Sequence, residues 1–187
     1  MKPSVGVVVV LVSNLCLAIQ LAAVEPIRSG LQPGQEITTI FEPLNLNGDY
    51  ANQPHCLVCE NGLCPVVMVL ARDLNAPLLK LLARLDKACV LHAKDELGGF
   101  AVFLDASDPL TEKLRAAAAS AELKKIVLAT EAETQVAEYR AAAEAEVTVM
   151  LYVRHQVKAN FAFRTGELND AAIEKIVSAL PQILDVK

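Results

Sequence analysis

The sequence passes from HCLVCENGLCP (residues 55–65) directly into VVMVLA (residues 66–71), and this junction decides the fold. The second stretch is a short, unbroken apolar run rich in valine. A run of that length and composition predicts a β-strand that is buried on both faces. The first stretch places Cys56, Cys59, Cys64 and His55 just before that strand. The sequence therefore predicts a central strand with sulfur chemistry at its beginning.

An amphipathic helix is expected directly after this strand. Leu78, Leu82, Leu85 and Cys89 follow one another at spacings of four, three and four residues. This spacing keeps the four side chains on one face of a helix. Because that face is apolar, we expect it to pack on the sheet with Cys89 buried inside.

The rest of the chain alternates between strand and helix patterns. A short strand at 38–41 is expected before the cysteine segment. The later elements are strands at 100–104, 126–129, 147–153 and 157–163, and helices at 109–123, 134–143 and 169–184. The short connection at His155 and Gln156 makes the last two strands antiparallel, and Asn169 is a suitable N-cap for the last helix. The pattern predicts an α/β fold with a central mixed β-sheet flanked by helices.

This order of elements resembles the thioredoxin-like fold superfamily in its peroxiredoxin-like (redoxin) elaboration. The resemblance covers residues 35–184, and the stretches that carry it are PVVMVLAR (65–72), FAVFLD (100–105) and VTVMLY (147–152). It implies a three-layer sandwich and thiol chemistry at the end of the first core strand.

The chain departs from this pattern at three positions. The superfamily's reactive cysteine follows the first core strand, but here that segment is RDLNAP (72–77). The superfamily also has a cis-proline before the later strand, where this chain has Val147, and a trans bond is expected. The CxxC pair itself precedes the first core strand, at the opposite end of the sheet from the usual site. Arg72 and Asp73, at the usual end, are weaker candidates for a functional role.

The cysteine segment contains Asn61-Gly62, a strong signal for a two-residue hairpin. Such a hairpin would place Cys59 opposite Cys64, within the distance that a disulfide accepts. We therefore expect a Cys59–Cys64 bridge that Cys56 attacks. Cys56, Cys59 and Cys64 are the candidate catalytic residues of a thiol-disulfide exchange relay.

Two other uses of the segment remain open. One is a purely structural disulfide in a non-catalytic or protein-binding module, since exported domains often contain such bridges. The other is a zinc site formed by His55, Cys56, Cys59 and Cys64, which has a suitable number of ligands. No cofactor is expected, and the expected partner is a protein that carries thiols or a disulfide.

The N-terminus has the layout of a secretory signal peptide over residues 1–23. Lys2 precedes a long apolar run that ends at Ala22-Ala23. A membrane anchor is the alternative if this segment is not cleaved. Residues 24–36 contain several prolines and glycines and are interpreted as a linker, so the domain is expected over 37–187. The protein is predicted to be secreted or periplasmic, where disulfides persist.

The charge of the chain argues against nucleic acid as a ligand. The 187 residues contain 17 basic and 22 acidic side chains, a net charge of −5, and there is no tryptophan. The phosphate backbone of a nucleic acid repels an acidic surface, and stacking on bases needs aromatic side chains. We therefore do not expect the protein to bind nucleic acid.

Overall fold

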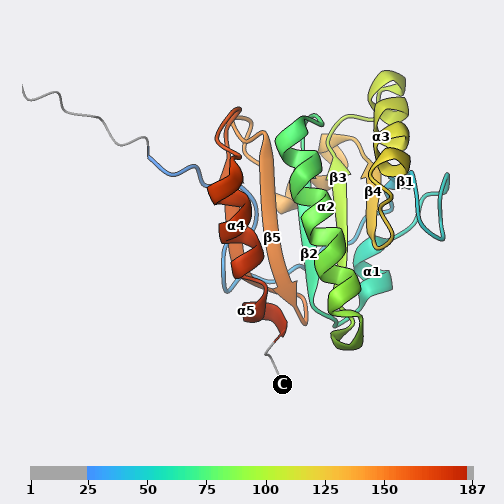
Figure 1. The fold of residues 1–187 in the computed structure, drawn as a ribbon. Coiled ribbons are helices and arrows are strands. Elements are labelled where there is room, and N and C mark those ends of the chain that lie inside the picture. The colour runs from blue at the N-terminus through green and yellow to red at the C-terminus, as the bar shows by residue number, and fades with distance from the viewer. Residues whose placement is uncertain (1–24, 185–187) are drawn as a thin grey trace, which may run out of the picture.

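Six strands form one mixed sheet in the order β1-β4-β3-β2-β5-β6 (Figure 1). The computed structural model describes residues 25–184, so the predicted signal peptide lies outside the described residues. The strands are β1 (Leu44–Asn45), β2 (Val66–Ala71), β3 (Gly98–Phe103), β4 (Ile126–Thr130), β5 (Val147–Val153) and β6 (Gln156–Phe163). Strand β3 is parallel to β2 and to β4, whereas the other pairs are antiparallel. The predicted α/β class and mixed sheet are confirmed.

The helices differ from the sequence prediction mainly in the second half of the chain. They are α1 (Leu57–Asn61), α2 (Ala76–Leu91), α3 (Asp108–Ser120), α4 (Asp170–Ser178) and α5 (Pro181–Leu184), with 3₁₀ helices η1 (Ala93–Asp95) and η2 (Glu133–Tyr139). The long final helix predicted over 169–184 is two helices, because Pro181 lacks an N–H and cannot continue α4. The helix predicted over 134–143 is the 3₁₀ helix η2, in which Val136 leaves the helical conformation.

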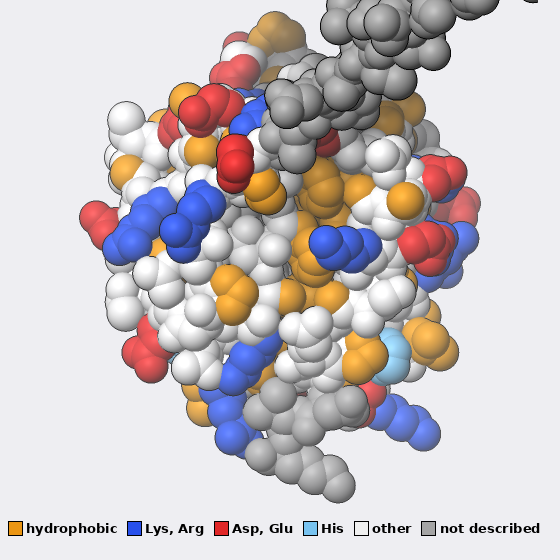
Figure 2. Space-filling view, turned by 90° about the vertical axis from the view of Figure 1, so that its left-hand side faces the viewer, with side chains coloured by type: hydrophobic (Ala, Val, Ile, Leu, Met, Phe, Trp, Pro, Cys, Tyr) orange, Lys and Arg blue, Asp and Glu red, His pale blue; other side chains and the backbone are white. Residues whose placement is uncertain are grey.

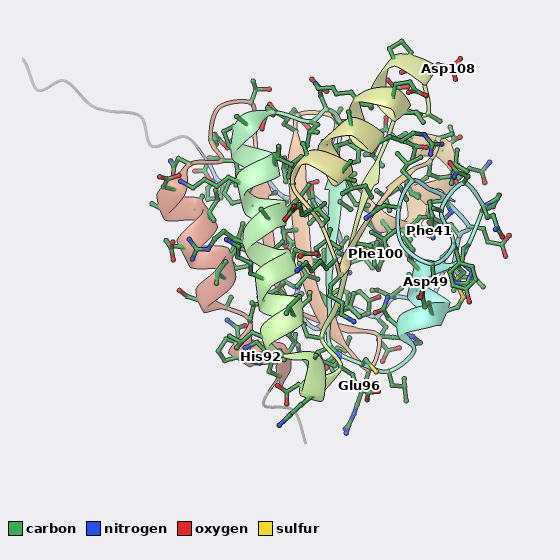
Figure 3. The ribbon with its side chains drawn as sticks, turned by 45° about the vertical axis from the view of Figure 1, so that its right-hand side comes forward. Phe41, Asp49, His92, Glu96, Phe100 and Asp108 are labelled. Atoms are coloured by element: carbon green, nitrogen blue, oxygen red, sulfur yellow. A yellow bond between two sulfur atoms is a disulfide. The ribbon has the colours of Figure 1, made fainter. Side chains whose placement is uncertain are left out.

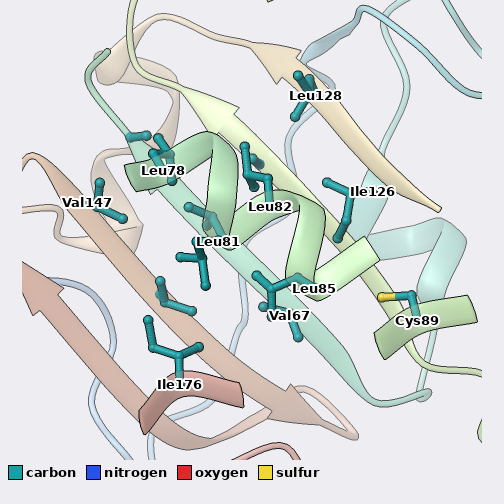
Figure 4. Close-up of a cluster of buried hydrophobic side chains, with 14 of the residues drawn as sticks. Val67, Leu78, Leu81, Leu82, Leu85, Cys89, Ile126, Leu128, Val147 and Ile176 are labelled. Atoms are coloured by element: carbon teal, nitrogen blue, oxygen red, sulfur yellow. The ribbon is translucent and has the colours of Figure 1, made fainter. Parts of the chain in front are cut away.

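One face of the sheet is covered by the α-helices that follow β2, β3 and β6. Figure 4 shows the resulting core, in which leucines of α2 lie over the central strands. Leu78, Leu82, Leu85 and Cys89 are all fully buried. The predicted buried stripe of this helix is therefore confirmed. Helices α2 and α3 lie on the same face because both make right-handed crossovers between parallel strands that follow one another in the sheet.

The other face is covered mainly by irregular chain and by η2. Phe41 packs edge-on against Tyr139, with ring centroids 5.3 Å apart, in a second apolar cluster. The strand predicted at 38–41 is not formed. The Thr39 carbonyl accepts a hydrogen bond of 2.6 Å from the Tyr139 hydroxyl, so a side chain replaces a neighbouring strand there.

The segment that was interpreted as a linker contacts the domain already at Glu25, whose carbonyl accepts from the Arg164 guanidinium, and more closely at Ser29 and Gly30. The Ser29 hydroxyl is buried and lies 2.6 Å from the Thr148 hydroxyl, and the Asn160 amide donates to the carbonyls of Ser29 and Leu31. Gly30 adopts a φ of 77°, and a Cβ there would lie 2.7 Å from the Thr148 methyl group. A glycine is required at this close approach. Within residues 25–184, no helix is both long and apolar enough to cross a membrane.

Candidate functional site: the CxxC pair before strand β2

Helix α1 places the two cysteines of the CxxC pair in its first turn. Cys56 is the N-cap, and its Sγ accepts a hydrogen bond of 3.1 Å from the Cys59 N–H. The two sulfur atoms are bonded to each other, with a Cα–Cα distance of 5.3 Å. Leu57 and Val58, each 2% exposed, fix this short helix on the sheet. The bridge therefore sits on an anchored turn directly before β2.

This pairing corrects the prediction from the Asn61-Gly62 signal. These residues end α1 instead of forming a hairpin: the Asn61 amide donates to the Leu57 carbonyl at 2.7 Å, and the Gly62 N–H contacts the Val58 and Cys59 carbonyls. Gly62 has a φ of 53°, a positive value that glycine adopts more readily than other residues. The predicted Cys59–Cys64 bridge is therefore wrong.

The same pairing changes the chemistry available to Cys56. In the predicted relay, a Cys56 thiolate attacks a Cys59–Cys64 bridge and releases Cys64. In the structure Cys56 is itself one half of the bridge, and Cys64 is a free thiol. The predicted relay starts from a free Cys56 thiol and a Cys59–Cys64 bridge, and the structure contains neither.

The two bonded cysteines differ sharply in accessibility. Cys56 is 7% exposed and belongs to the second apolar cluster, whereas Cys59 is exposed. Attack on a disulfide needs access along the bond to the sulfur that is attacked. Cys59 is the more accessible residue of the two, so the two ends of the bridge have different surroundings.

The remaining thiols of the described chain are kept protonated by their surroundings. Cys64 is partly exposed, and its thiol lies 3.8 Å from the Glu96 carboxylate. Burial, and then the Glu96 charge and hydrogen bond, raise the pKa of Cys64. Burial raises the pKa of Cys89 to about 12, with a smaller contribution from Asp86. Because the thiolate is the reactive form, both are slow nucleophiles near neutral pH.

His55 precedes Cys56 in the sequence, and its ring contacts two side chains that were not among the predicted site residues. Its ring stacks on Tyr50 with centroids 3.5 Å apart and an angle of 10° between the planes. Its Nε2 lies 3.2 Å from Glu60 Oε2, at ion-pair distance but without hydrogen-bond alignment. Glu60 follows Cys59 in the sequence, and this position could have indicated that it belongs to the site. Tyr50 gave no such indication, because its approach depends on the loop after β1.

The zinc alternative does not fit this arrangement. The bridge joins the sulfurs of Cys56 and Cys59, whereas zinc binds cysteine as the thiolate. Among residues 25–184, no three His, Cys, Asp or Glu side chains are grouped in a way that would hold a metal ion.

The site lies at the N-terminal ends of the parallel strands, where His92 and Glu96 are labelled in Figure 3. The Pro65 carbonyl accepts from the Gly98 N–H at the start of β3, and the Leu63 carbonyl accepts from the Arg154 N–H in the β5–β6 turn. The predicted location, at the end of the sheet opposite to the superfamily's usual site, is confirmed.

At that usual end, ion pairs occupy the space after β2. The Arg72 guanidinium donates to both Glu133 carboxylate oxygens, at 2.6 and 3.0 Å, and to the Ala142 and Ala145 carbonyls. The hydrogen bond from Arg72 lowers the pKa of Glu133. Asp73 accepts from Lys113 at 2.8 Å. Arg72 and Asp73 therefore already have partners.

The backbone at the usual end also departs from the superfamily pattern, as expected. No cis peptide bond occurs within residues 25–184, so the bond before Val147 is trans.

The side of the molecule that carries α4 and β6 has a different character. Figure 2 shows apolar side chains exposed there between lysines and arginines. A cavity of about 530 Å³ on this side is lined by residues that include Phe161, Phe163, Arg164 and Lys175. None of the described residues that line it is a cysteine, so this cavity is separate from the thiol site.

Solved structures with this fold include several thiol enzymes. No protein-family model matches the sequence, and no curated protein matches it. Peroxidoxin BcpB from Mycobacterium tuberculosis is similar over 84% of this chain and 99% of its own, with 13% identity and a TM-score of 0.62. The thioredoxin domain of a thiol-disulfide oxidoreductase from Bacteroides vulgatus is similar over 80% and 99%, with 11% identity and a TM-score of 0.56.

A third similar structure is the yeast mitochondrial 1-Cys peroxiredoxin. It matches over 80% of this chain and 76% of its own, with 11% identity and a TM-score of 0.57. At identities this low the similarity is one of fold. The described chain therefore has the thioredoxin-like redoxin fold, with a bonded CxxC pair placed before its first core strand.

Proposed function

We propose that this protein exchanges disulfides with a dithiol in another protein or peptide through the Cys56–Cys59 bridge. The observation that carries the proposal is the asymmetry of the bridge. Cys59 is exposed, whereas Cys56 is buried and accepts a hydrogen bond from the Cys59 N–H. An exchange site needs one sulfur that can be attacked and one that can leave as a stabilised thiolate.

The exchange balances in two steps. A partner thiolate attacks Cys59 Sγ, a partner–Cys59 disulfide forms, and the Cys56–Cys59 bond breaks. Cys56 leaves as a thiolate, and the hydrogen bond from the Cys59 N–H stabilises it. The partner's second thiolate then attacks the partner sulfur bonded to Cys59 and releases Cys59. The partner dithiol is oxidised to a disulfide, and the two electrons reduce the bridge to a dithiol.

The small loop that the disulfide closes favours exchange over a purely structural role. The two cysteines are three residues apart in sequence. In the chain-entropy model a ring this small contributes only about 2 kcal/mol to stability, at the low end for disulfides. A bridge that closes a long loop would stabilise the fold more. The proposal also includes an oxidising location, outside the cell or in a periplasm, reached through the signal peptide predicted at residues 1–23.

The test compares Cys56→Ser with Cys59→Ser, both in a Cys64→Ser background. Serine is itself a preferred N-cap, so Cys56→Ser preserves the start of α1. Each reduced variant is mixed with an aromatic disulfide reagent that releases a coloured thiolate. We expect the variant that retains Cys59 to react roughly tenfold faster or more, because its thiol is exposed. It should also form a mixed disulfide with a peptide that contains a disulfide, because the Cys59 thiolate attacks one peptide sulfur and the other leaves as a thiolate.

Two outcomes would contradict this assignment. Equal reaction rates for the two variants would show that the ends of the bridge are not distinct. Failure of the unmutated oxidised protein to oxidise any peptide dithiol, with the fold intact by circular dichroism, would remove the exchange function.

The second candidate is a non-catalytic binding module that retained the fold. The Arg72–Glu133 pair supports it, because a salt bridge occupies the end of the sheet where this fold usually performs chemistry. In that case reduction of the bridge would lower the melting temperature, and dithiol oxidation would be absent. Dithiol oxidation by the wild-type protein that is lost in both cysteine variants would reject this candidate.

A further inference from the structure

Strand β6 forms an edge of the sheet, because within residues 25–184 it pairs with one strand, β5. An edge strand carries backbone N–H and C=O groups that point away from the sheet and can bind a further strand. At the beginning of β6 the N-terminal segment takes this position. The Gly34 N–H donates to the Val157 carbonyl at 2.8 Å, and the Val157 N–H donates to the Gln35 carbonyl at 3.0 Å. The first part of the edge is therefore already paired.

The second part of this edge has outward-pointing backbone groups at Asn160 and Ala162. The Phe163 carbonyl accepts from the Glu146 N–H at 2.9 Å, so Phe163 faces β5. In an antiparallel pair, residues that bond the neighbouring strand alternate with residues that point away from it. A register shift of the β5–β6 pair after Val157 changes the alternation between the two parts of the edge. The described chain forms no hydrogen bond with the outward backbone groups of Asn160 and Ala162.

The cavity of about 530 Å³ described above lies along these groups. Its lining includes Asn160 and Ala162 of β6, Ala172 and Lys175 of α4, and residues 25–28 of the N-terminal segment. Ligand sites in proteins commonly have volumes of about 300–1,000 Å³. The free part of the edge therefore opens into a space large enough for a short stretch of extended chain.

Basic side chains outnumber acidic ones around this cavity. The charged residues of its described lining are Arg28, Arg164 and Lys175 on one side and Glu25 and Glu167 on the other. Arg164 and Glu167 pair with each other at 3.4 Å. Arg28 and Lys175 form no ion pair within residues 25–184, and Lys175 Nζ lies 5.9 Å from the centre of the Phe161 ring. Cations without carboxylate partners thus face the groove of a chain whose net charge is −5.

We propose that this cavity binds an extended acidic segment of a partner protein, which adds a strand to the free part of β6. The backbone of the segment pairs with the outward groups of Asn160 and Ala162. Its side chains alternate between α4, where Lys175 lies, and the N-terminal segment, where Arg28 lies. Main-chain hydrogen bonds supply affinity in this mode of binding, and side-chain contacts supply specificity. The inference goes beyond disulfide exchange, because no described lining residue is a cysteine.

Charge favours an acidic partner over a second copy of this chain. Two β6 edges that paired about a two-fold axis would bring two sets of Arg28 and Lys175 to one interface. Like charges that lie opposite each other across paired strands are destabilising, and lysines beside an edge are a common protection against self-pairing. An acidic segment instead meets the opposite charge.

The test measures the fluorescence anisotropy of a labelled peptide added to the oxidised full chain. The peptide has about six residues, the usual length of a strand, and pairs of glutamates alternate with pairs of valines, so both of its faces carry carboxylates. We expect saturable binding that weakens as salt is added. The same peptide with lysine in place of glutamate should bind roughly tenfold more weakly or worse.

Methylation of the peptide's backbone nitrogens separates strand addition from attraction between charges. In an added strand, alternate N–H groups point to β6 and the others point away. Methyl groups on one alternate set should therefore abolish binding, and methyl groups on the other set should change the affinity by less than about twofold. Both methylated peptides retain the charge of the parent peptide.

Two substitutions in the protein test the same contacts. Lys175→Glu should weaken binding roughly fivefold, whereas Lys87→Glu, an equal change of charge on the exposed side of α2, should not. Ala162→Pro removes an outward N–H without removing a bond to β5, as an edge strand allows. It should lower the affinity roughly three- to tenfold, and Ala162→Ser, which keeps the N–H, is its control.

Three results would overturn the inference. The first is the absence of saturable binding by the full chain. The second is equal binding of the acidic and basic peptides, or equal effects of the two methylation patterns. The third is a dimer in sedimentation equilibrium that excludes the peptide, which would assign the edge to a second copy. If Ala162→Pro does not fold by circular dichroism, the methylated peptides test the same hydrogen bonds on the unmutated protein.

Discussion

Substitution of Asp86 provides a direct test of how α2 is joined to β4. Asp86 is 6% exposed on α2, and its Oδ1 accepts three backbone hydrogen bonds, from Lys124 at 2.9 Å, Lys125 at 2.7 Å and Ile126 at 2.8 Å. These N–H groups precede or begin β4. A single carboxylate oxygen therefore satisfies the donors of the turn that leads into this strand.

The loss of unfolding free energy in Asp86→Ala can be estimated from the three backbone hydrogen bonds that are lost. The Ile126 N–H is buried and would remain without an acceptor, at a cost of roughly 1.5–3 kcal/mol for a bond to a charged group. Lys124 and Lys125 are exposed, so water can replace part of their bonds, at about 0.5 kcal/mol each. The sum is about 3 kcal/mol. For a domain of this size that corresponds to a decrease in Tm of roughly 6–12 °C.

The assay is thermal and urea unfolding followed by circular dichroism, with the bridge kept oxidised. Asp86→Asn keeps an acceptor oxygen and should lose less than half as much stability as Asp86→Ala. Asp49→Ala is the matched control, because Asp49 is exposed and no side-chain hydrogen bond forms there. An Asp86→Ala protein that melts within about 2 °C of the wild type would refute the reasoning about these buried donors.

Three further predictions concern the thiols and the β5–β6 turn. Because Glu96 contributes to the raised pKa of Cys64, Glu96→Gln should move the alkylation of Cys64 to lower pH; an unchanged pH profile would contradict the contact. Cys89, fully buried with its pKa raised to about 12, should react with thiol reagents only in denaturant, and mass spectrometry of the native protein would detect any modification. Arg154 and His155 have positive φ angles of 52° and 60°, which asparagine and glycine adopt more readily, so the Asn-Gly double substitution should raise the unfolding free energy by about 1 kcal/mol in urea titrations.

The elements with strong local patterns were predicted well from the sequence. Strand β2 is buried along its whole length, as its unbroken apolar run indicated, and β5 behaves in the same way. The leucine stripe of α2 and the N-cap at Asn169 were also found, since the Asn169 side chain accepts from the Ala172 N–H. In each case burial or capping follows from residue spacing within one element, so no distant contact was needed.

The predictions that failed concern features that more than one structure can satisfy. Asn61-Gly62 suits a hairpin turn as well as a helix end, because both need a residue with positive φ. The real two-residue hairpin is at Arg154-His155, where the local sequence gives no such signal. There the pairing of β5 with β6 imposes the turn, and it stabilises the fold enough to offset the conformational energy of two residues with positive φ.

The sequence by itself determined the alternation of strands and helices, the buried stripe of α2 and the position of the cysteines before the first core strand, because apolar spacing encodes burial directly. Tertiary structure decided which sulfurs are bonded and which one is exposed. Cys56 pairs with Cys59 since Leu57 and Val58 are buried against the sheet and hold the chain between them as a helical turn. Pairing depends on distances between atoms, and these distances come from packing that the spacing of cysteines in a sequence does not specify.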